Sequence, residues 1–263
     1  MKLLDILKLY VGVFRRVAYT LTIRMLDSDR KTTLLSLYNY YEDKKKIEDY
    51  TPSDPFIIPK TDVFELFGND YAIYEGVYEC GFGHTTEFEL KVLSNLVKKR
   101  TPKRIFEIGT FQGRTTLNMA LNISENAEII TLDLPASELA LTKMEIEEGE
   151  IRYVDKEISG ERFLGHPVAT KIRQVFGDSA TFSFSEYNNS VDLAFIDGSH
   201  AYEYVINDSQ KVFAMMRPGG LIIWHDYTNW KGVWSALNEL YQSDSRFKNL
   251  KHIGGTSIAL LQL

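Results

Sequence analysis

The sequence predicts an α/β protein built on a doubly wound, mostly parallel sheet, with an added N-terminal helical extension. From Glu87 onward, short apolar runs typical of buried strands alternate with amphipathic segments typical of helices. Strands that alternate with helices form parallel sheets covered on both faces. The last two apolar runs, RFKNLKHI and TSIALLQL, have no helix between them, so we expect a closing antiparallel hairpin. A chain of 263 residues, 44% of them hydrophobic, is long enough for one large domain of this kind.

Each regular element has its own signal in the sequence. The strand segments are short and rich in large aliphatic residues, and the helical segments carry apolar residues at three- and four-residue spacing. We predict helices at 87–100, 115–124, 203–216 and 233–243, and strands at 104–108, 127–134, 171–176, 191–197 and 219–226.

The first 62 residues are predicted to be an amphipathic helical extension followed by a linker. Residues 1–46 hold ten Lys or Arg against five Asp or Glu, and apolar residues near the start follow helical spacing. A basic amphipathic helix of this kind can lie on an anionic membrane surface. It can equally pack on the domain or on a second subunit, so we also expect a homo-oligomer. Charges interrupt the apolar run too often for a transmembrane span or a signal peptide.

Proline and glycine mark the boundaries that follow. Residues 49–62, DYTPSDPFIIPKTD, contain three prolines and are typical of a linker. Residues 63–86 are rich in glycine and aromatic residues and form a candidate lid at the start of the domain, which we place at 63–263. Residues 135–170 are polar and show no period. We expect the two irregular segments to build the substrate pocket, because loops vary independently of the fold that carries them.

Charge and cysteine content exclude several functional classes. The net charge is −6, which argues against nucleic-acid binding, since that usually needs a basic face. Cys80 is the only cysteine, so an internal disulfide is impossible, and we expect a small buried hydrophobe there. Nothing in the composition indicates secretion. We therefore expect a cytoplasmic protein, with association at a membrane surface as the alternative that the basic extension leaves open.

Polar residues gather where the predicted strands end, which is where open parallel sheets bind ligands. The first strand runs into FEIGTFQG, in which Gly109 and Gly113 bracket a tight turn that lets backbone approach a ligand closely. The dinucleotide spacing G-x-G-x-x-G is absent. Glu107 at the strand end disfavours a pyrophosphate and suits a cationic or amino-acid-like ligand. A purely structural turn is the alternative.

The second and third strand ends add further acids. Asp133 lies 24 residues after Gly109, where a carboxylate can accept both hydroxyls of a ribose. The alternative is a helix cap or a solvated loop acid. Asp178 and Ser179 follow the third strand and could bond an adenine amino group, or simply cap a turn.

The fourth and fifth strand ends carry candidate reactive groups. Asp197 and Asp226 are hard oxygen ligands suited to Mg²⁺ or Mn²⁺, and neighbouring strands would bring them together. His225 could be a further, softer ligand, a second base, a substrate contact or a packing residue. His200, three residues after Asp197, can accept a proton near neutral pH. The alternatives are that His200 simply follows a Ser199 helix cap and that Asp226 merely starts a helix.

Five motifs occur together in order: FEIGTFQGRTT, TLDLP, GDSATF, IDGSHAYEYV and MRPGGLIIWHDY. Over residues 83–263 they resemble the class I S-adenosylmethionine-dependent methyltransferases. The most similar branch is the metal-dependent sugar O-methyltransferases of macrolide biosynthesis, and the catechol O-methyltransferases are more distant. The resemblance implies a seven-stranded Rossmann-like sheet with a final hairpin. It also implies cofactor contacts: Glu107, Gly109 and Gly113 at the methionine part, Asp133 at the ribose, Asp178 and Ser179 at the adenine, and Thr85 in a segment that approaches the cofactor.

The resemblance also implies a reaction. It implies methyl transfer to a hydroxyl of a sugar or another small natural product, with Asp197 as a metal ligand and His200 as the general base. Where the similar enzymes have two adjacent acids, this sequence has His225 and Asp226, which leaves the metal's identity open. We expect these residues and Asp197 to hold Mg²⁺ or Mn²⁺. The rivals are a metal-independent methyltransferase acting on nitrogen, carbon or an acidic hydroxyl, and a scaffold that binds the cofactor without catalysis.

Overall fold

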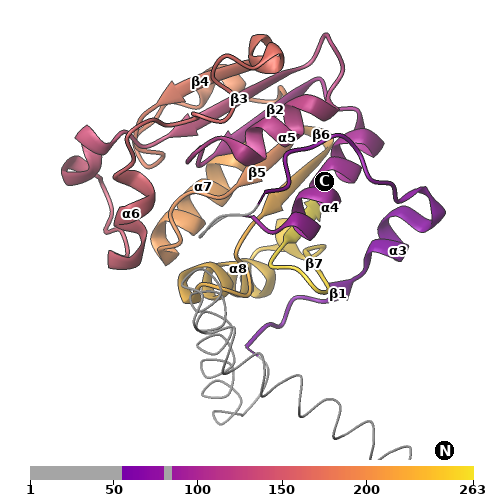
Figure 1. Cartoon of the computed structure of the whole chain (residues 1–263). Coiled ribbons are helices and arrows are strands. Elements are labelled where there is room, and N and C mark those ends of the chain that lie inside the picture. The colour runs from indigo at the N-terminus through magenta and orange to yellow at the C-terminus, as the bar shows by residue number, and fades with distance from the viewer. Residues whose placement is uncertain (1–54, 80–84) are drawn as a thin grey trace, which may run out of the picture. The chain divides into compact units, whose positions relative to one another are not determined.

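The computed structural model describes residues 55–79 and 85–263 (Figure 1). Residues 55–263 form one compact unit. The predicted N-terminal helix, with its membrane or subunit contact, and Cys80 lie outside the described residues. Among the residues that are described, no helix is long and apolar enough to cross a bilayer.

The sheet in the described part of the chain has eight strands, in the order β1-β7-β8-β6-β5-β2-β3-β4. Neighbouring strands run parallel except at β8, which is antiparallel to both β6 and β7. The doubly wound sheet and its closing hairpin are therefore confirmed. The strands are β1 (Lys60–Thr61), β2 (Arg104–Ile108), β3 (Glu128–Asp133), β4 (Ile172–Phe176), β5 (Val191–Ile196), β6 (Met216–Trp224), β7 (Lys251–Ile253) and β8 (Ala259–Gln262).

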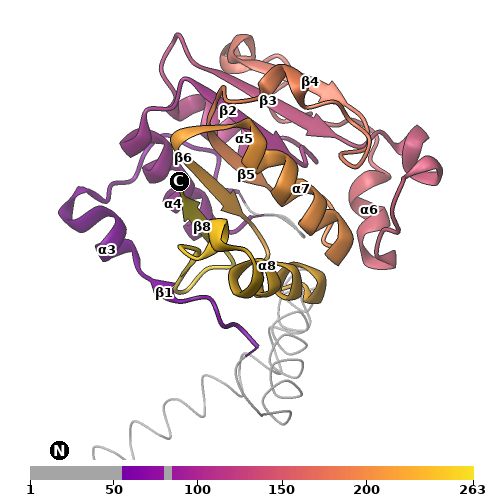
Figure 2. The ribbon, with the colours of Figure 1, turned by 180° about the vertical axis from the view of Figure 1, so that it is seen from behind.

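Helices cover both faces of this sheet, as Figures 1 and 2 show from opposite sides. The long helices are α4 (Glu87–Arg100), α5 (Arg114–Asn122), α7 (Tyr202–Met215) and α8 (Lys231–Ser243). Residues of α4 and α5 pack in one hydrophobic cluster, and residues of α7 and α8 pack in another. Consecutive strand residues alternate between the clusters: Ile105 and Leu193 belong to the first, Phe106 and Ala194 to the second. Side chains of period two explain this division.

The structure differs from the prediction at residues 55–62, which were expected to be a linker. Ile58 is only 2% exposed and belongs to a core cluster, and its backbone N–H donates to the Tyr227 hydroxyl (3.3 Å). β1 then pairs in parallel with β7 and adds an eighth strand to the seven expected. Burial of Ile58, with Phe56 partly buried against the same core cluster, holds this segment on the domain.

The irregular segments consist mostly of short helical turns. α3 (Val63–Phe67) and the turn η2 (Gly68–Asp70) follow β1. Between β3 and β4 lie η3 (Ala136–Leu141), η4 (Glu148–Glu150), α6 (Ile151–Val154) and η5 (Pro167–Lys171). The chain runs from β2 toward one edge of the sheet through β3 and β4, and then toward the other edge through β5 and β6. The order therefore reverses between β2 and β5, where such sheets bind ligands.

Candidate active site

The ends of β2, β5 and β6 meet in register at the reversal point. Ile108 pairs with Ile196, and Ile196 pairs with Trp224. The ladder continues for one more residue, because Asp197 N–H donates to the Ile108 carbonyl (2.8 Å) and His225 N–H donates to the Ile196 carbonyl (3.0 Å). Asp197 and His225 therefore emerge side by side from neighbouring strands.

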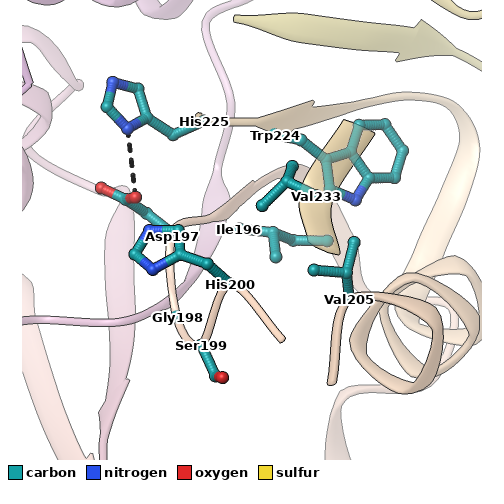
Figure 3. A pocket seen from close by; sticks show the side chains of 9 residues that line it. All are labelled: Ile196, Asp197, Gly198, Ser199, His200, Val205, Trp224, His225 and Val233. Atoms are coloured by element: carbon teal, nitrogen blue, oxygen red, sulfur yellow. Dashed lines mark ion pairs between the residues drawn. The ribbon is translucent and has the colours of Figure 1, made fainter. Parts of the chain in front are cut away.

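Asp197, His225 and Asp226 form a compact cluster of ligand-type atoms, all within 4.8 Å of one another. His225 Nδ1 lies 3.2 Å from Asp197 Oδ1, the ion pair dashed in Figure 3, and 3.2 Å from Asp226 Oδ2. Two ligand atoms bonded at right angles to one small divalent ion lie about 3 Å apart. The donor set and its spacing thus fit a divalent cation, and the structure brings these three residues together as the sequence predicts.

Asp226 adopts a backbone conformation that is unusual for its type. Its φ is 62°, in the left-handed region, where Asp is tolerated better than most residues but still strained. Its Oδ1 accepts a hydrogen bond from the Asn229 side chain (2.6 Å). The N-cap of α8 is Trp230, and no side-chain cap bond is present there. Asp226 is therefore not the N-cap of α8, although its carbonyl accepts the N–H groups of Asn229 and Trp230 in the turn that leads into the helix.

His200 is held between two carboxylates. Its Nδ1 lies 2.5 Å from Glu150 Oε1, and its Nε2 lies 2.8 Å from Asp226 Oδ2. The ring also stacks on Trp230, with centroids 4.5 Å apart and planes 9° from parallel. Burial alone would lower the pKa of His200, but the hydrogen bonds with Asp226 and Glu150 raise it to about 9. These contacts therefore favour the protonated form of His200 at neutral pH.

Glu150 is a site residue that sequence reasoning missed. It lies in the segment between β3 and β4 and is 3% exposed. Besides its contacts with His200, its Oε2 accepts a hydrogen bond from the Ser199 hydroxyl (2.9 Å). The Ser199 hydroxyl therefore donates to Glu150 and does not cap α7. Ala201 occupies the N-cap of that helix. No period or motif marked Glu150 among the acids around it.

Glu89 is a second missed residue, and it contacts His225 from α4. Its Oε2 lies 3.2 Å from His225 Nε2, and its Oε1 accepts hydrogen bonds from the Ser257 N–H and hydroxyl (both 2.7 Å). Burial would raise the pKa of Glu89, but hydrogen bonds and charge from His225, with the Ser257 hydrogen bonds, hold it well below its usual range. Thr86 and Glu89 also form a capping box, the one signal that the sequence offered for this residue.

The charge on His225 follows from the same contacts. Burial would lower the pKa of His225, but the nearby Asp197 and Asp226 carboxylates raise it well above its usual value. Conversely, burial would raise the pKa of Asp226, but His225 and His200 hold it well below its usual range. The cluster therefore accommodates positive charge, here carried by imidazolium.

On the cofactor side, Glu107 is completely buried at the end of β2. Its Oε2 accepts hydrogen bonds from Thr116 Oγ1 (2.5 Å) and Thr131 Oγ1 (2.6 Å). Its Oε1 has no hydrogen-bond partner among the described residues. Burial raises the pKa of Glu107 to about 8. A buried acceptor without a donor fits a ligand that carries an amino or another cationic group.

Asp133 ends β3 beside the Gly109 turn, where a ribose was expected. Its Oδ1 accepts from the Thr110 N–H (3.3 Å). Its Oδ2 accepts from the Ser159 hydroxyl (2.5 Å) and lies 2.7 Å from Lys156 Nζ. The carboxylate is only 7% exposed, so the segment after α6 covers it. Asp133 is engaged by protein groups in this structure, and its contact with a ribose stays a prediction.

The two glycines of the turn are required by contacts within the chain. Both have positive φ, 95° at Gly109 and 80° at Gly113. A Cβ atom at Gly109 would overlap the backbone carbonyl of Asp197, and one at Gly113 would overlap the Phe163 ring. The structural-turn alternative therefore accounts for both glycines, whatever ligand the turn approaches.

Asp178 behaves as the turn-capping alternative predicts. Asp178 Oδ1 accepts hydrogen bonds from the Ala180 N–H (2.8 Å) and the Tyr204 hydroxyl (2.9 Å), and its Oδ2 accepts from the Lys143 N–H (2.8 Å). Ser179 is 9% exposed, and an adenine contact for this pair stays a prediction.

Thr85 lies just before α4 and close to the turn. It is 4% exposed, and its hydroxyl lies 3.1 Å from the Thr115 hydroxyl. Its carbonyl accepts from Arg114 Nη1 (2.6 Å). These contacts join the residue to the first turn of α5, so Thr85 is near the expected cofactor site, as predicted.

Comparison with known proteins identifies the fold and its class. A family model described as a methyltransferase domain matches residues 106–227. The uncharacterised protein R132 of Acanthamoeba polyphaga mimivirus is 27% identical over 170 residues, covering 62% of this chain and 72% of that protein. The caffeoyl-CoA O-methyltransferase of Stellaria longipes is 26% identical over 191 residues, covering 64% and 71%.

A solved structure supports the same assignment at the level of the fold. The SAH-bound methyltransferase PaMTH1 of Podospora anserina superposes with a TM-score of 0.50 at 16% identity, covering 67% of this chain and 78% of that one. The strand order, the acids at the strand ends and the matched domain agree with one another. These findings support an S-adenosylmethionine-dependent methyltransferase whose methyltransferase domain is matched at residues 106–227.

Proposed function

We propose that the protein transfers the methyl group of S-adenosylmethionine to a hydroxyl group of a small molecule, with the help of a divalent cation. The observation that carries this proposal is the meeting of Asp197, His225 and Asp226 beside His200. A bound cation can polarise an unreactive hydroxyl, and a buried imidazole can accept its proton. Residues suited to both roles lie together where the parallel strands end.

At the cofactor end, the chain has to hold S-adenosylmethionine and align the hydroxyl with it. The cofactor itself supplies the methyl group and its leaving group. Glu107 offers its unpaired buried oxygen to the methionine end. Asp133 is the group for the ribose hydroxyls, once Lys156 and Ser159 release it. Holding both reactants in line removes the entropic part of the barrier.

At the acceptor end, Asp197, His225 and Asp226 are the residues for the cation, which when bound polarises the acceptor oxygen and eases loss of its proton. His200 is the group for that proton, because its Nε2 faces the cluster through Asp226 while Glu150 holds Nδ1. With a pKa of about 9, His200 accepts no proton at neutral pH unless positive charge offsets Asp226. The base and the cation site are thus coupled in this proposal.

Two acceptor classes remain candidates: the hydroxyl of a sugar or related natural product, and a phenolic hydroxyl. The second is favoured by a relative named for caffeoyl-CoA, whose ring carries adjacent phenolic hydroxyls. It is also favoured by an aromatic edge around His200. Trp230 stacks on His200, and Tyr153 lies edge-on to His200 (6.5 Å) and to Phe111 (5.5 Å). Aromatic rings of this kind can stack on a planar acceptor.

The proposal is tested first by calorimetric titration of S-adenosylhomocysteine into the protein, with and without Mn²⁺. We expect micromolar binding that Asp133→Ala abolishes. Methyl transfer from labelled S-adenosylmethionine is then measured on matched panels of sugars and catechols, before and after chelation of metal. Full activity after chelation would favour the metal-independent rival. Binding without transfer to any acceptor would favour the scaffold, and no binding in either condition would overturn the proposal.

A further inference from the structure

His225, the histidine of the cation cluster, contacts the carboxylate of Glu89 through the ring nitrogen opposite the cluster. Glu89 Oε2 lies 3.2 Å from His225 Nε2 and also accepts from the Thr86 N–H (2.9 Å) and hydroxyl (2.8 Å). Glu89 Oε1 accepts the two Ser257 hydrogen bonds already described. Both residues are nearly buried, with side chains 7% exposed at His225 and 4% at Glu89. Four donors and a helix start therefore fix the acceptor that faces Nε2.

The opposite nitrogen of the same ring faces the two carboxylates of the cluster. His225 Nδ1 is buried and makes no hydrogen bond with any described residue, although both carboxylates of the cluster lie 3.2 Å away. A cation bound at the cluster would replace the positive charge that imidazolium otherwise carries there. The ring would then be neutral and keep one N–H, which Glu89 accepts at Nε2. The lone pair then lies on Nδ1, between Asp197 and Asp226. A carboxylate that orients a histidine in this way is a recurrent partner of metal-bound imidazole.

We propose, on the basis of the proposed cation site, that its nitrogen donor makes the site select transition-metal ions such as Mn²⁺, Co²⁺ and Zn²⁺ over Mg²⁺ and Ca²⁺. Glu89 is the positioning residue for this selectivity, since it holds Nδ1 toward the ion. Mg²⁺ and Ca²⁺ prefer oxygen ligands, whereas imidazole suits the first-row transition metals. One nitrogen and two carboxylate oxygens form a mixed set that an all-acid cluster would not offer.

The wild-type protein tests the proposal without any assay of turnover. Pulsed electron paramagnetic resonance of the Mn²⁺-loaded protein detects a coordinated nitrogen by its coupling to the electron spin. Calorimetry measures the dissociation constants of Mn²⁺, Mg²⁺ and Ca²⁺ separately. We expect nitrogen coupling and tighter binding of Mn²⁺ than of either hard cation. Mn²⁺ bound without nitrogen coupling, or Mg²⁺ bound as tightly as Mn²⁺, would overturn the inference.

Two variants and a matched control separate the roles of the residues. His225→Asp introduces a pair of adjacent acids. The variant should show no nitrogen coupling and no preference for Mn²⁺. Glu89→Gln should weaken Mn²⁺ binding by about 10- to 100-fold. Glu87→Gln changes an exposed acid of the same helix turn that pairs with Lys91, and should leave metal binding unchanged. A preference for Mn²⁺ that persists in His225→Asp would contradict the inference.

The outcomes distinguish this inference from the proposed function beneath it. If Mg²⁺ binds as well as Mn²⁺ and Asp197→Asn abolishes both, the cation site stands and only the selectivity is wrong. If no divalent ion binds, the metal part of the proposed function fails together with the inference. Thermal unfolding of each variant checks that it is folded, and the spectrum of the wild-type protein decides the question if Glu89→Gln is not.

Discussion

Replacement of Lys156 by Ala should tighten the binding of S-adenosylhomocysteine. In the structure, Lys156 Nζ lies 2.7 Å from Asp133 Oδ2, and the two side chains are 10% and 7% exposed. The same oxygen is the one that ribose hydroxyls would need. If ribose displaces the ammonium, this ion pair stabilises only the cofactor-free state, and its removal favours the bound state.

The size of the effect follows from the contact that is lost. A hydrogen bond to a charged group contributes about 1.5–3 kcal/mol. When such a contact exists only in the free protein, deleting it tightens binding by roughly 10- to 100-fold. The same deletion lowers the melting temperature of the free protein, because Asp133 is left buried without its counter-ion. Ser159→Ala removes a neutral donor from the same oxygen and should have a smaller effect in the same direction.

Calorimetry of S-adenosylhomocysteine with both variants provides the measurement, together with thermal unfolding of each free and bound form. Lys103→Ala, at an exposed lysine before β2, serves as the control for loss of charge. Weaker binding in Lys156→Ala would refute the reasoning, since it would mean that the ammonium contacts the bound cofactor. Unchanged binding in Asp133→Asn would show that the ribose lies elsewhere.

Three further predictions concern the base, a buried acid and the glycine turn. His200→Ala should lower kcat by about 100- to 10,000-fold while leaving calorimetric binding of S-adenosylhomocysteine unchanged; an unchanged kcat would remove His200 as the base. Burial raises the pKa of Asp208 from 3.8 to about 7, so the folded state keeps a proton that the unfolded state releases between these values. Stability measured by urea unfolding should therefore fall as pH rises from 4 to about 7, and Asp208→Asn should flatten that decline; a parallel decline in the variant would contradict this. Gly109→Ala should prevent folding because its Cβ meets the Asp197 carbonyl, whereas Gly165→Ala, at the same sign of φ in open space, should cost only about 1–2 kcal/mol; similar melting temperatures for the two would refute the steric argument.

Elements with strong local signals were predictable to within a few residues. α4 begins and ends where expected because Thr86 and Glu89 form a capping box and three basic residues occupy its last turn. β2 has the predicted bounds, 104–108, because a short apolar run between polar residues is typical of a buried strand. β1 was not predictable: two residues carry no period, and their pairing with β7 joins segments at opposite ends of the described chain.

In the candidate site, too, some residues could be predicted from local signals and others could not. The proximity of Asp197 and His225 could be predicted from the sequence, because the carboxyl ends of neighbouring parallel strands lie at the same edge of the sheet. Glu150 and Glu89 could not, since they lie 50 residues from His200 and 136 from His225, and no local rule links such positions. For Gly109 and Gly113, in contrast, the sequence pattern indicated more than the structure requires. Their pattern suggested a ligand, while contacts with Asp197 and Phe163 already require them.

Both histidines at the strand tips are therefore controlled by acids that the strands do not supply. Glu89 comes from the start of α4, and Glu150 comes from the segment between β3 and β4. Each acid contacts the imidazole nitrogen that faces away from the Asp226 carboxylate, so each influences which nitrogen carries a proton. An exchange of Glu150 would alter the proton affinity of His200, and an exchange of Glu89 would alter the donor atom at His225, with the sheet unchanged. The sheet therefore fixes where Asp197, His225 and Asp226 meet, while these two flanking segments fix the hydrogen-bond partners of the two histidines.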